Sequence, residues 1–203
     1  MMRKKIVSLC MALALCLGLL PVTALAEGAA PDNNLYVGDQ VLPVGLDSYW
    51  TTSTDGELIT CEATNDWNVA YDAGSTTLTL KNATIEGVLN DVNTAGTGIY
   101  AASSSGAVSL NIVLEGENRV SGGHGINVSS GKAASLSISG SGSLTVSATA
   151  INGVGILVQA QSDANLTING ANVNAVVTET NGRGVELSTG QASNPNLTIE
   201  VQG

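Results

Sequence analysis

The one histidine of this chain is its first candidate for acid–base chemistry. His124 lies between two glycines, in a Gly-His-Gly sequence. Hydrolysis of a glycosidic bond needs two carboxyl groups placed around the scissile bond, and no such pair accompanies His124. An internal repeat puts Thr97, Val154 and Arg183 at the same position. We therefore interpret position 124 as a variable loop position, and we expect no catalytic residue and no enzymatic activity.

Acidic residues that follow the first 50 positions are candidates for a calcium site. Calcium takes hard oxygen ligands, and Asp55, Glu57, Asp66 and Asp72 bring carboxylates into one short stretch. Their spacing matches neither an EF-hand loop nor a Gly-Gly-x-Gly-x-Asp repeat. Calcium is the one cofactor that these residues suggest.

Aromatic side chains are the candidates for sugar binding. Trp50, Trp67 and Tyr100 could each offer a sugar ring a flat apolar face with a polar edge. Five of the six aromatic residues lie within residues 27–76. For Trp50 and Trp67 we favour packing inside a cap over contact with a ligand.

The first 26 residues predict export. The basic run Arg3-Lys4-Lys5 precedes an apolar segment from Ile6 to Leu20, and Ala24-Leu25-Ala26 supplies a cleavage site of small residues. This is the pattern of a secretory signal peptide, and the segment is shorter than the ~20 residues that cross a bilayer. We expect a secreted or cell-surface protein with no membrane insertion after processing.

The residues after position 26 are strongly acidic. They hold four basic and all seventeen acidic residues, which makes a formal charge of −13. This charge repels nucleic-acid phosphates and anionic membranes, so we expect no nucleic-acid partner. It favours solubility, with cation binding as the alternative. Cys61 is the single cysteine of this part and cannot form an internal disulfide.

Three signatures repeat at a period of about 30 residues, which is typical of solenoids. A Leu-x-Leu or Leu-x-Ile strand recurs at steps of 32, 26, 30 and 31 residues. It begins at Leu78, Leu110, Leu136, Leu166 and Leu197. A residue that tolerates positive φ follows each of the first four strands, namely Asn82, Gly116, Gly140 and Gly170. A Gly-x-Gly sequence before an apolar alternation has its second glycine at Gly98, Gly125, Gly155 and Gly184.

The repeat predicts an all-β fold, a right-handed parallel β-helix of about four coils. Each coil holds three strands that alternate Leu, Ile or Val inward with Ser, Thr or Asn outward. A β-sandwich is the competing fold, but its strands would not repeat one three-part signature in a fixed order. We assign residues 1–26 to the signal peptide, 27–76 to an N-terminal cap and 77–203 to the β-helix. The last range ends inside a fifth coil, so we expect a partner or a missing segment to cover it.

Two local motifs resemble those of β-helix enzymes. Gly123-His124-Gly125 resembles a catalytic motif of polygalacturonase-type hydrolases, but the paired aspartates and the Arg-x-Lys motif of that family are absent from this sequence. Asp91, Glu115, Glu117 and Arg119 are the nearest approach to the calcium ligands and base of pectate lyases. We interpret these four as a solvated face, and a polysaccharide lyase or hydrolase is the least favoured function.

A longer stretch resembles secreted β-helix proteins of Gram-positive gut bacteria that are grouped with carbohydrate-binding domains. The resemblance rests on Trp67 to Ile85, with its Tyr-Asp and Thr-Leu-Thr-Leu-Lys-Asn-Ala sequences, and on Leu35-Tyr36-Val37-Gly38. It covers roughly residues 35–203 and implies a β-helix and export. Some proteins of this group bind acidic plant polysaccharide with calcium, but the shared motifs point to no binding residue.

Two non-catalytic functions remain as hypotheses. The first is a secreted or cell-surface module that binds polysaccharide or mediates adhesion. The second is a structural stalk, or a fragment of a larger surface protein, that has no ligand of its own.

Overall fold

The computed structural model describes residues 34–42, 45–88, 96–190 and 195–200. The predicted signal peptide, residues 1–26, lies outside the described residues. Contact clustering separates Met1–Ala30 from Pro31–Gly203, and the description that follows concerns the second unit. Its described part consists of strands and turns without a helix, so no helix there is long and apolar enough to cross a membrane.

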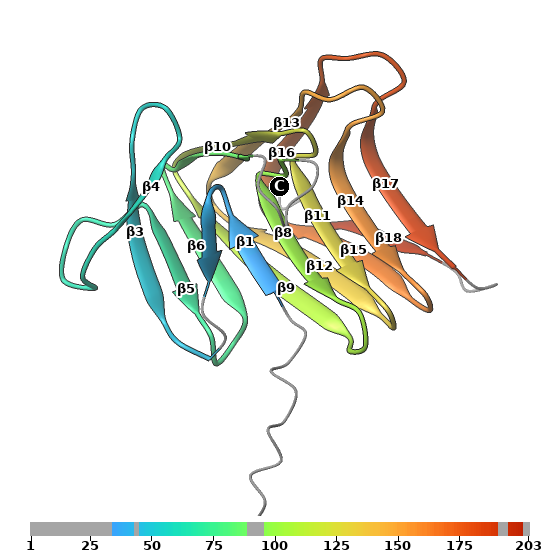
Figure 1. The fold of residues 1–203 in the computed structure, drawn as a ribbon, viewed down its shortest axis with the longest axis horizontal. Helices are drawn as coiled ribbons and strands as arrows, with labels where there is room; N and C mark the ends of the chain where they lie inside the picture. The colour runs from blue at the N-terminus through green and yellow to red at the C-terminus, as the bar shows by residue number, and fades with distance from the viewer. Residues whose placement is uncertain (1–33, 43–44, 89–95, 191–194, 201–203) are drawn as a thin grey trace, which may run out of the picture. The chain divides into compact units, whose positions relative to one another are not determined.

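The solenoid consists of three parallel sheets, which we call A, B and C (Figure 1). Sheet A contains β8 (Ile99–Ser103), β11 (Ile126–Ser130), β14 (Val154–Ala160) and β17 (Arg183–Thr189). Sheet B contains β6 (Thr77–Lys81), β9 (Val108–Glu115), β12 (Ala134–Gly140), β15 (Ala164–Asn169) and β18 (Asn196–Glu200). Sheet C contains β7 (Thr84–Glu86), β10 (Glu117–Gly122), β13 (Ser143–Ala148) and β16 (Asn172–Val177).

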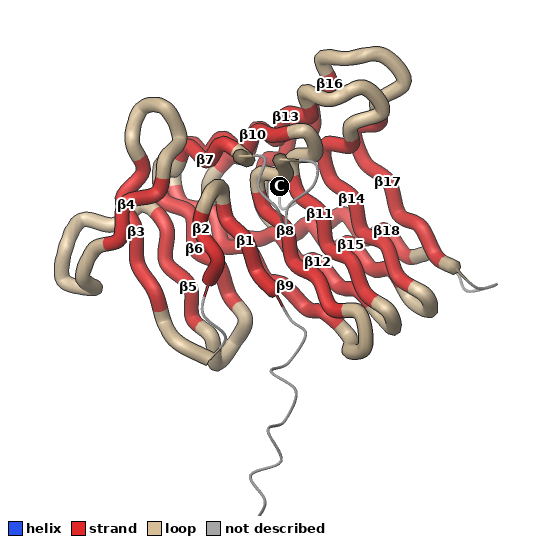
Figure 2. Tube along the Cα trace, in the orientation of Figure 1, coloured by secondary structure: helices blue, strands red, loops and turns tan. Residues whose placement is uncertain are grey.

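Each turn of the solenoid passes through sheets A, B and C in that order. The fold is a parallel β-solenoid of about three turns, each of about 29 residues. The three complete turns run from β8 to β16, while β6 and β7 precede them and β17 and β18 follow them. Figure 2 shows the strands on the sides of the coils and the loops at the corners. The predicted parallel β-helix of three-strand coils is confirmed, with about three turns where the repeat predicted about four coils.

The register of sheet B confirms the leucine repeat except at its first member. Leu136 pairs with both Leu110 and Leu166, and Leu166 pairs with Leu197. The expected alignment of Leu78 with Leu110 is wrong, because Leu78 pairs with Ile112. β9 is eight residues long against five in β6, and β6 pairs with the last five residues of β9. A shift of two residues keeps the same set of side chains inward, so the error does not change the core.

The core lies between the three sheets. Inward side chains such as Leu80, Ile112, Ile138 and Ile156 are completely buried. Burying one such side chain contributes about 1.5–3 kcal/mol. A single coil cannot bury its own apolar face, so this stabilisation arises when coils stack.

The predicted turn residues between sheets B and C all have positive φ. The values are +48° at Asn82, +66° at Gly116, +107° at Gly140 and +68° at Gly170. At Gly116 a second constraint applies, because an added Cβ would overlap Oδ1 of Asn82. That oxygen already accepts a hydrogen bond from the N–H of Glu117 at 3.1 Å.

One buried amide ties three coils together at this corner. Asn118 is 2 % exposed, and its Oδ1 accepts the N–H of Ala83 at 2.9 Å. Its Nδ2 donates to the carbonyl of Ser143 at 3.2 Å and to that of Glu115 at 3.1 Å. Ala83 belongs to the preceding coil and Ser143 to the following one, so this polar side chain is satisfied inside an apolar core.

The residues before the solenoid form antiparallel strands on two of its sheets. β1 (Asn34–Val37) pairs with β8 and with β2 (Gln40–Leu42) on sheet A. On sheet B, β5 (Val69–Asp72) pairs with β6 and with β3 (Ser48–Thr52), which pairs with β4 (Leu58–Thr60). Figure 1 shows these strands at one end of the stack. Their inward side chains Leu42, Trp50, Leu58 and Val69 join the buried core.

Candidate functional site

A trough of uncharged polar side chains crosses the outer face of sheet A. Residues at matching positions of its four parallel strands pair from coil to coil, in the order Ala102, Ser129, Gln159 and Ser188. The turns that follow these strands add Ser104, Gly131, Gln161 and Gly190. We call these eight residues together the polar trough.

The trough consists of two adjoining hollows. One, of about 420 Å³, begins at Tyr100 and ends at Gln161. The other, of about 280 Å³, continues to Ser188 and Gly190. Ser129 and Gln161 line both hollows, so the two form one path along the direction in which the coils stack.

Glycines in the turns let neighbouring coils approach closely beside the trough. An added Cβ at Gly131 would overlap the carbonyl oxygen of Ser104, and one at Gly190 would overlap Oε1 of Gln161. Side chains and glycines thus alternate from coil to coil along this edge. The missing side chains at these glycines thus let each turn pack closely against the preceding one.

The hydroxyl groups at the floor and those on the outer face have different roles. Ser130 donates to the carbonyl of Gly106 at 2.7 Å and accepts the N–H of Lys132 at 2.9 Å, so its hydroxyl holds the turn. On the outer face, Gln159 Nε2 donates to Ser129 Oγ at 3.1 Å and links two coils. A side-chain amide and a hydroxyl keep further donor and acceptor capacity after one such bond.

An aromatic pair lies at the start of the trough. Tyr100 faces outward on β8 and stacks on Tyr36 of β1, with ring centroids 5.8 Å apart and an angle of 26° between the rings. Tyr36 is 5 % exposed, while Tyr100 is half-buried and lines the first hollow. Burial, with the neighbouring Tyr36, raises the pKa of Tyr100, so its phenol stays protonated at neutral pH.

Tyr100 begins a second outward row beside the trough. Asn127 pairs with Tyr100 and with Leu157, and Leu157 pairs with Glu186. Asn127 is 9 % and Leu157 8 % exposed. The Oδ1 atom of Asn127 has no hydrogen-bond partner in the described part of the chain.

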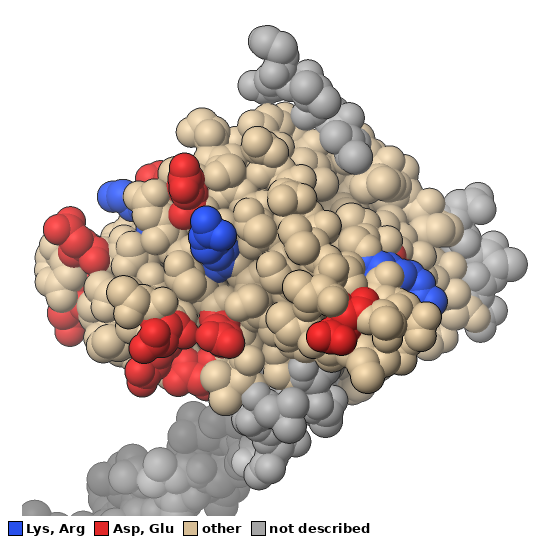
Figure 3. Space-filling model, turned by 90° about the horizontal axis from the view of Figure 1, so that it is seen from above, with Lys and Arg blue, Asp and Glu red and all other residues tan. Residues whose placement is uncertain are grey.

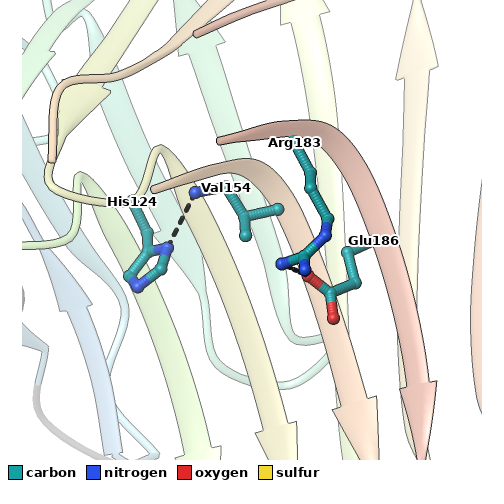
Figure 4. A network of polar contacts seen from close by, with 4 residues as sticks. All are labelled: His124, Val154, Arg183 and Glu186. Carbon is teal, nitrogen blue, oxygen red and sulfur yellow. Dashed lines mark hydrogen bonds and ion pairs between the residues drawn. The ribbon is translucent and has the colours of Figure 1, made fainter. Parts of the chain in front are cut away.

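The ring of His124 is used as a hydrogen-bond acceptor between coils (Figure 4). Its Nδ1 accepts the backbone N–H of Val154 at 2.9 Å. Burial lowers the pKa of His124, and the nearby Glu186 partly opposes this shift. One coil after Val154, Arg183 pairs with it. The repeat predicts this pairing, because it gives Val154 and Arg183 the same position as His124.

The four calcium candidates do not form one group. Asp55 and Glu57 line a cleft of about 520 Å³ together with Asp39 and Glu86, and neither Asp66 nor Asp72 belongs to this lining. Within the described ranges no group of three or more His, Cys, Asp or Glu side chains is arranged to hold a metal ion. Figure 3 shows several acidic side chains gathered at one end of the face in view, with a largely uncharged surface beyond them.

Asp72 has a role in the backbone turn between β5 and β6. Its Oδ1 accepts the N–H of Gly74 at 2.8 Å and that of Ser75 at 3.2 Å. The hydrogen bonds with Ser75, followed by that with Gly74, lower the pKa of this carboxyl. The residue thus shapes a turn, as short acidic side chains often do.

The two tryptophans differ in exposure. Trp50 is 3 % exposed and packs in the core. Trp67 is half-buried, lies 6.2 Å from Tyr49 between ring centroids, and has Nζ of Lys81 5.8 Å from its ring centroid. Tyr100 is the one of the three predicted sugar contacts that lines the polar trough.

The described residues that resemble a lyase site lie apart from the trough, at the corner between sheets B and C and on sheet C. Glu115 and Glu117 flank the turn at Gly116, and all of these are exposed. Arg119 pairs with Thr84 and Thr145 on sheet C and is exposed as well. Asp91 lies outside the described residues.

The sequence analysis missed the polar trough, although its signal is present. Each member of the row lies four residues after the second glycine of a Gly-x-Gly sequence, as Ser129 does after Gly125 and Gln159 after Gly155. Ser and Gln are ordinary residues for an outward strand position, so their types carry no signal. The hollows between them are lined by residues of successive coils, so only coordinates reveal them.

No family model, curated protein or solved structure matches the chain. The fold assignment, a β-solenoid of about three turns, therefore rests on the strand pairing described above.

Proposed function

We propose that this chain is a secreted or cell-surface, non-catalytic β-solenoid module that binds polysaccharide and thereby mediates adhesion. The observation that supports the proposal is the polar trough, which runs across four coils and begins at Tyr100. A long shallow path suits a polymer better than a small compact ligand, which is held in an enclosed pocket.

The chemistry of the trough supports a sugar ligand. Hydroxyl and amide groups both donate and accept hydrogen bonds, as sugar hydroxyls require. Ser129, Gln159 and Ser188 present such groups at neighbouring coils, which lie about 4.8 Å apart. The half-buried ring of Tyr100 adds an apolar face with a polar edge at one end.

The surroundings of His124 support a non-catalytic role. A general base must accept a substrate proton. Nδ1 of His124 already accepts the N–H of Val154, so the neutral ring carries its proton on Nε2 and has no free acceptor nitrogen. Arg183, at the same position two coils after His124, has an ion pair of 3.0 Å with Glu186. The proposed location, secreted or at the cell surface, is based on the N-terminal sequence and on the resemblance to secreted carbohydrate-binding β-helix proteins.

Affinity electrophoresis tests the proposal. The purified protein is run in native gels that contain one polysaccharide each, and in a gel without polymer as the reference. We expect retardation by at least one polymer, without release of reducing or unsaturated sugar ends into the gel. Gln159→Ala combined with Gln161→Ala should weaken retardation about tenfold, the effect of losing roughly 1.4 kcal/mol of hydrogen bonding.

A matched control carries the same kind of change on another sheet. Asn165→Ala combined with Thr167→Ala removes two outward polar side chains from β15 of sheet B and should leave retardation unchanged. If no polymer retards the wild-type protein, the proposal is wrong. If sugar ends are released, the module is an enzyme and the non-catalytic part is wrong.

The exposed apolar residues of the last strands favour a structural role as the second candidate. Val185 on β17 and Leu197 on β18 are inward positions of their coils, yet they are 41 % and 49 % exposed. Exposed strand edges with apolar side chains are prone to pair with another chain. A module that serves only as a stalk would bind no polysaccharide, so the same gels separate the two candidates.

A further inference from the structure

The two hollows of the polar trough follow one another from coil to coil and do not merge into one compact pocket. The first, of about 420 Å³, lies between Tyr100 and Gln161, and the second, of about 280 Å³, extends from Ser129 to Gly190. Both hollows are lined by Ser129 and Gln161. A single small ligand would fill one hollow and leave the other empty, whereas a chain that passes Gln161 contacts both.

The row of residues along this path has one member in each coil. Consecutive strands pair without an offset in register, in the order Ala102, Ser129, Gln159 and Ser188. Neighbouring strands lie about 4.8 Å apart, so the row is straight and about 14 Å long. A ligand that contacts each member must therefore advance by about 4.8 Å from one contact to the next.

The polar side chains of this path are accessible to a ligand. Ser129 and Gln159 are half-buried, while Ser188 and Gln161 are exposed. Hydroxyl and amide groups each offer several hydrogen-bonding positions, and the bond from Gln159 to Ser129 uses only one donor and one acceptor. The path can therefore offer hydrogen bonds to the hydroxyl groups of a ligand in successive coils.

Sugar polymers differ in how far the chain advances with each unit. In an extended chain, such as one of β-1,4-linked pyranoses, each unit advances by nearly the full length of its ring, which is close to the spacing of the coils. A coiled chain, such as an α-1,4-linked glucan, advances less with each unit and turns its hydroxyl groups in different directions. The extended chain is the one that keeps successive units in register with successive coils.

We infer that the ligand is an extended glycan, bound along the stacking direction of the coils with about one sugar unit per coil, and that about four units are needed to occupy both hollows. This inference rests on the proposed function and specifies the shape and the minimum length of its ligand. The first hollow is the larger one and contains Tyr100, so a short fragment binds there. The second hollow, with Gln159 and Ser188, adds affinity for chains that extend past Gln161.

Competition by fragments of the polymer tests the minimum length. The affinity gels contain xylan, glucomannan or polygalacturonate as extended chains, and soluble starch as the coiled one. The extended polymer that retards the protein is then hydrolysed, and its fragments are separated by length and added as competitors. We expect fragments of about four units to compete about tenfold better than disaccharides, because the second hollow adds at least one hydrogen bond. Longer fragments should bring little further gain.

The substitution Ser188→Ile tests the second hollow by itself. Ser188 is exposed on β17, and a β-branched residue suits a strand, so the melting temperature should not change. The isoleucine side chain occupies part of the second hollow and forms no hydrogen bond with a sugar. We expect this variant to bind disaccharides as the wild type does, which shows that it is folded, and to gain nothing from longer fragments. Thr198→Ile, on the last strand of sheet B, is the matched control and should keep the length dependence.

The outcomes separate this inference from the proposed function. Equal competition by fragments of every length, or retardation by starch alone, would leave a polysaccharide-binding module and overturn the inference. An unchanged length dependence in Ser188→Ile would overturn the part given to the second hollow. Absence of retardation in every gel would overturn the proposed function itself, and this inference with it.

Discussion

Nδ1 of His124 accepts the backbone N–H of Val154 at 2.9 Å, and this bond joins two successive coils of the solenoid. A protonated imidazole cannot accept at Nδ1, so the bond exists only with the neutral ring. Burial favours the same neutral form and lowers the pKa of His124, against the opposing effect of Glu186. Stability should therefore depend on pH through His124.

The sign of that dependence follows from proton linkage. The unfolded chain has a His pKa of about 6.5 and the folded chain a lower one, so the unfolded state binds more protons between the two values. The contribution of His124 is complete above pH of about 6.5 and is lost as the pH falls toward the folded pKa.

Urea unfolding at pH 7.5 and pH 5.0 measures this effect. His124→Thr is the comparison, because Thr97 holds the same position one coil earlier. The wild type should lose more free energy of unfolding between the two pH values than the variant does. Equal losses would show that His124 does not carry the dependence.

Asn118 should be among the costliest polar residues to replace. Asn118→Ala leaves the N–H of Ala83 and the carbonyl of Ser143 without their partner, and each unsatisfied buried group costs about 1–3 kcal/mol. Asn174→Ala on the exposed face of β16 is the control, with an expected change within about 0.5 kcal/mol. A similar unfolding free energy for both variants would contradict the role given to Asn118.

Alanine substitutions at two glycines with different surroundings should differ in their effect on stability. In Gly116→Ala the alanine must adopt a φ of +66°, and its Cβ overlaps the Oδ1 atom of Asn82. We therefore expect the free energy of unfolding to fall by more than about 1 kcal/mol. At Gly184 the nearest atom to an added Cβ is 3.6 Å away, which is ordinary contact. Gly184→Ala should therefore leave the unfolding midpoint in urea nearly unchanged, and a large loss there would contradict the open space beside this glycine.

The centre of the stack should be far more sensitive to truncation than its last strand. Leu136 is 0 % exposed and Leu197 is 49 % exposed, although both hold the same position of the repeat. Leu136→Ala should cost about 2–5 kcal/mol, and Leu197→Ala should cost less than about 1 kcal/mol. Equal costs would mean that Leu197 is covered in solution, which light scattering at several concentrations would then trace to self-association.

Features of the sequence that belong to a single coil, such as its turn residues, predict the structure well. Asn82 and Gly170 have the positive φ that their residue types suggest, and Thr97, His124, Val154 and Arg183 share one position as their spacing implies. The alignment of Leu78 failed because β9 has four alternating apolar residues and so offers more than one equivalent register. The choice between these registers depends on the neighbouring coil. The trough was not predictable for a similar reason, since its hollows arise between coils.

The antiparallel strands at the start of the solenoid have a consequence for how the chain reaches its fold. β1 and β2 are joined by a two-residue connection, Gly38-Asp39, and β5 and β6 by four residues. Parallel partner strands, in contrast, are separated by about 29 residues along the chain. Closing this longer loop has a greater entropic cost. Hairpins close within microseconds and non-local parallel pairing is slow. We expect these hairpins to form first and to serve as the template on which the later coils are wound in order, from β8 toward β18.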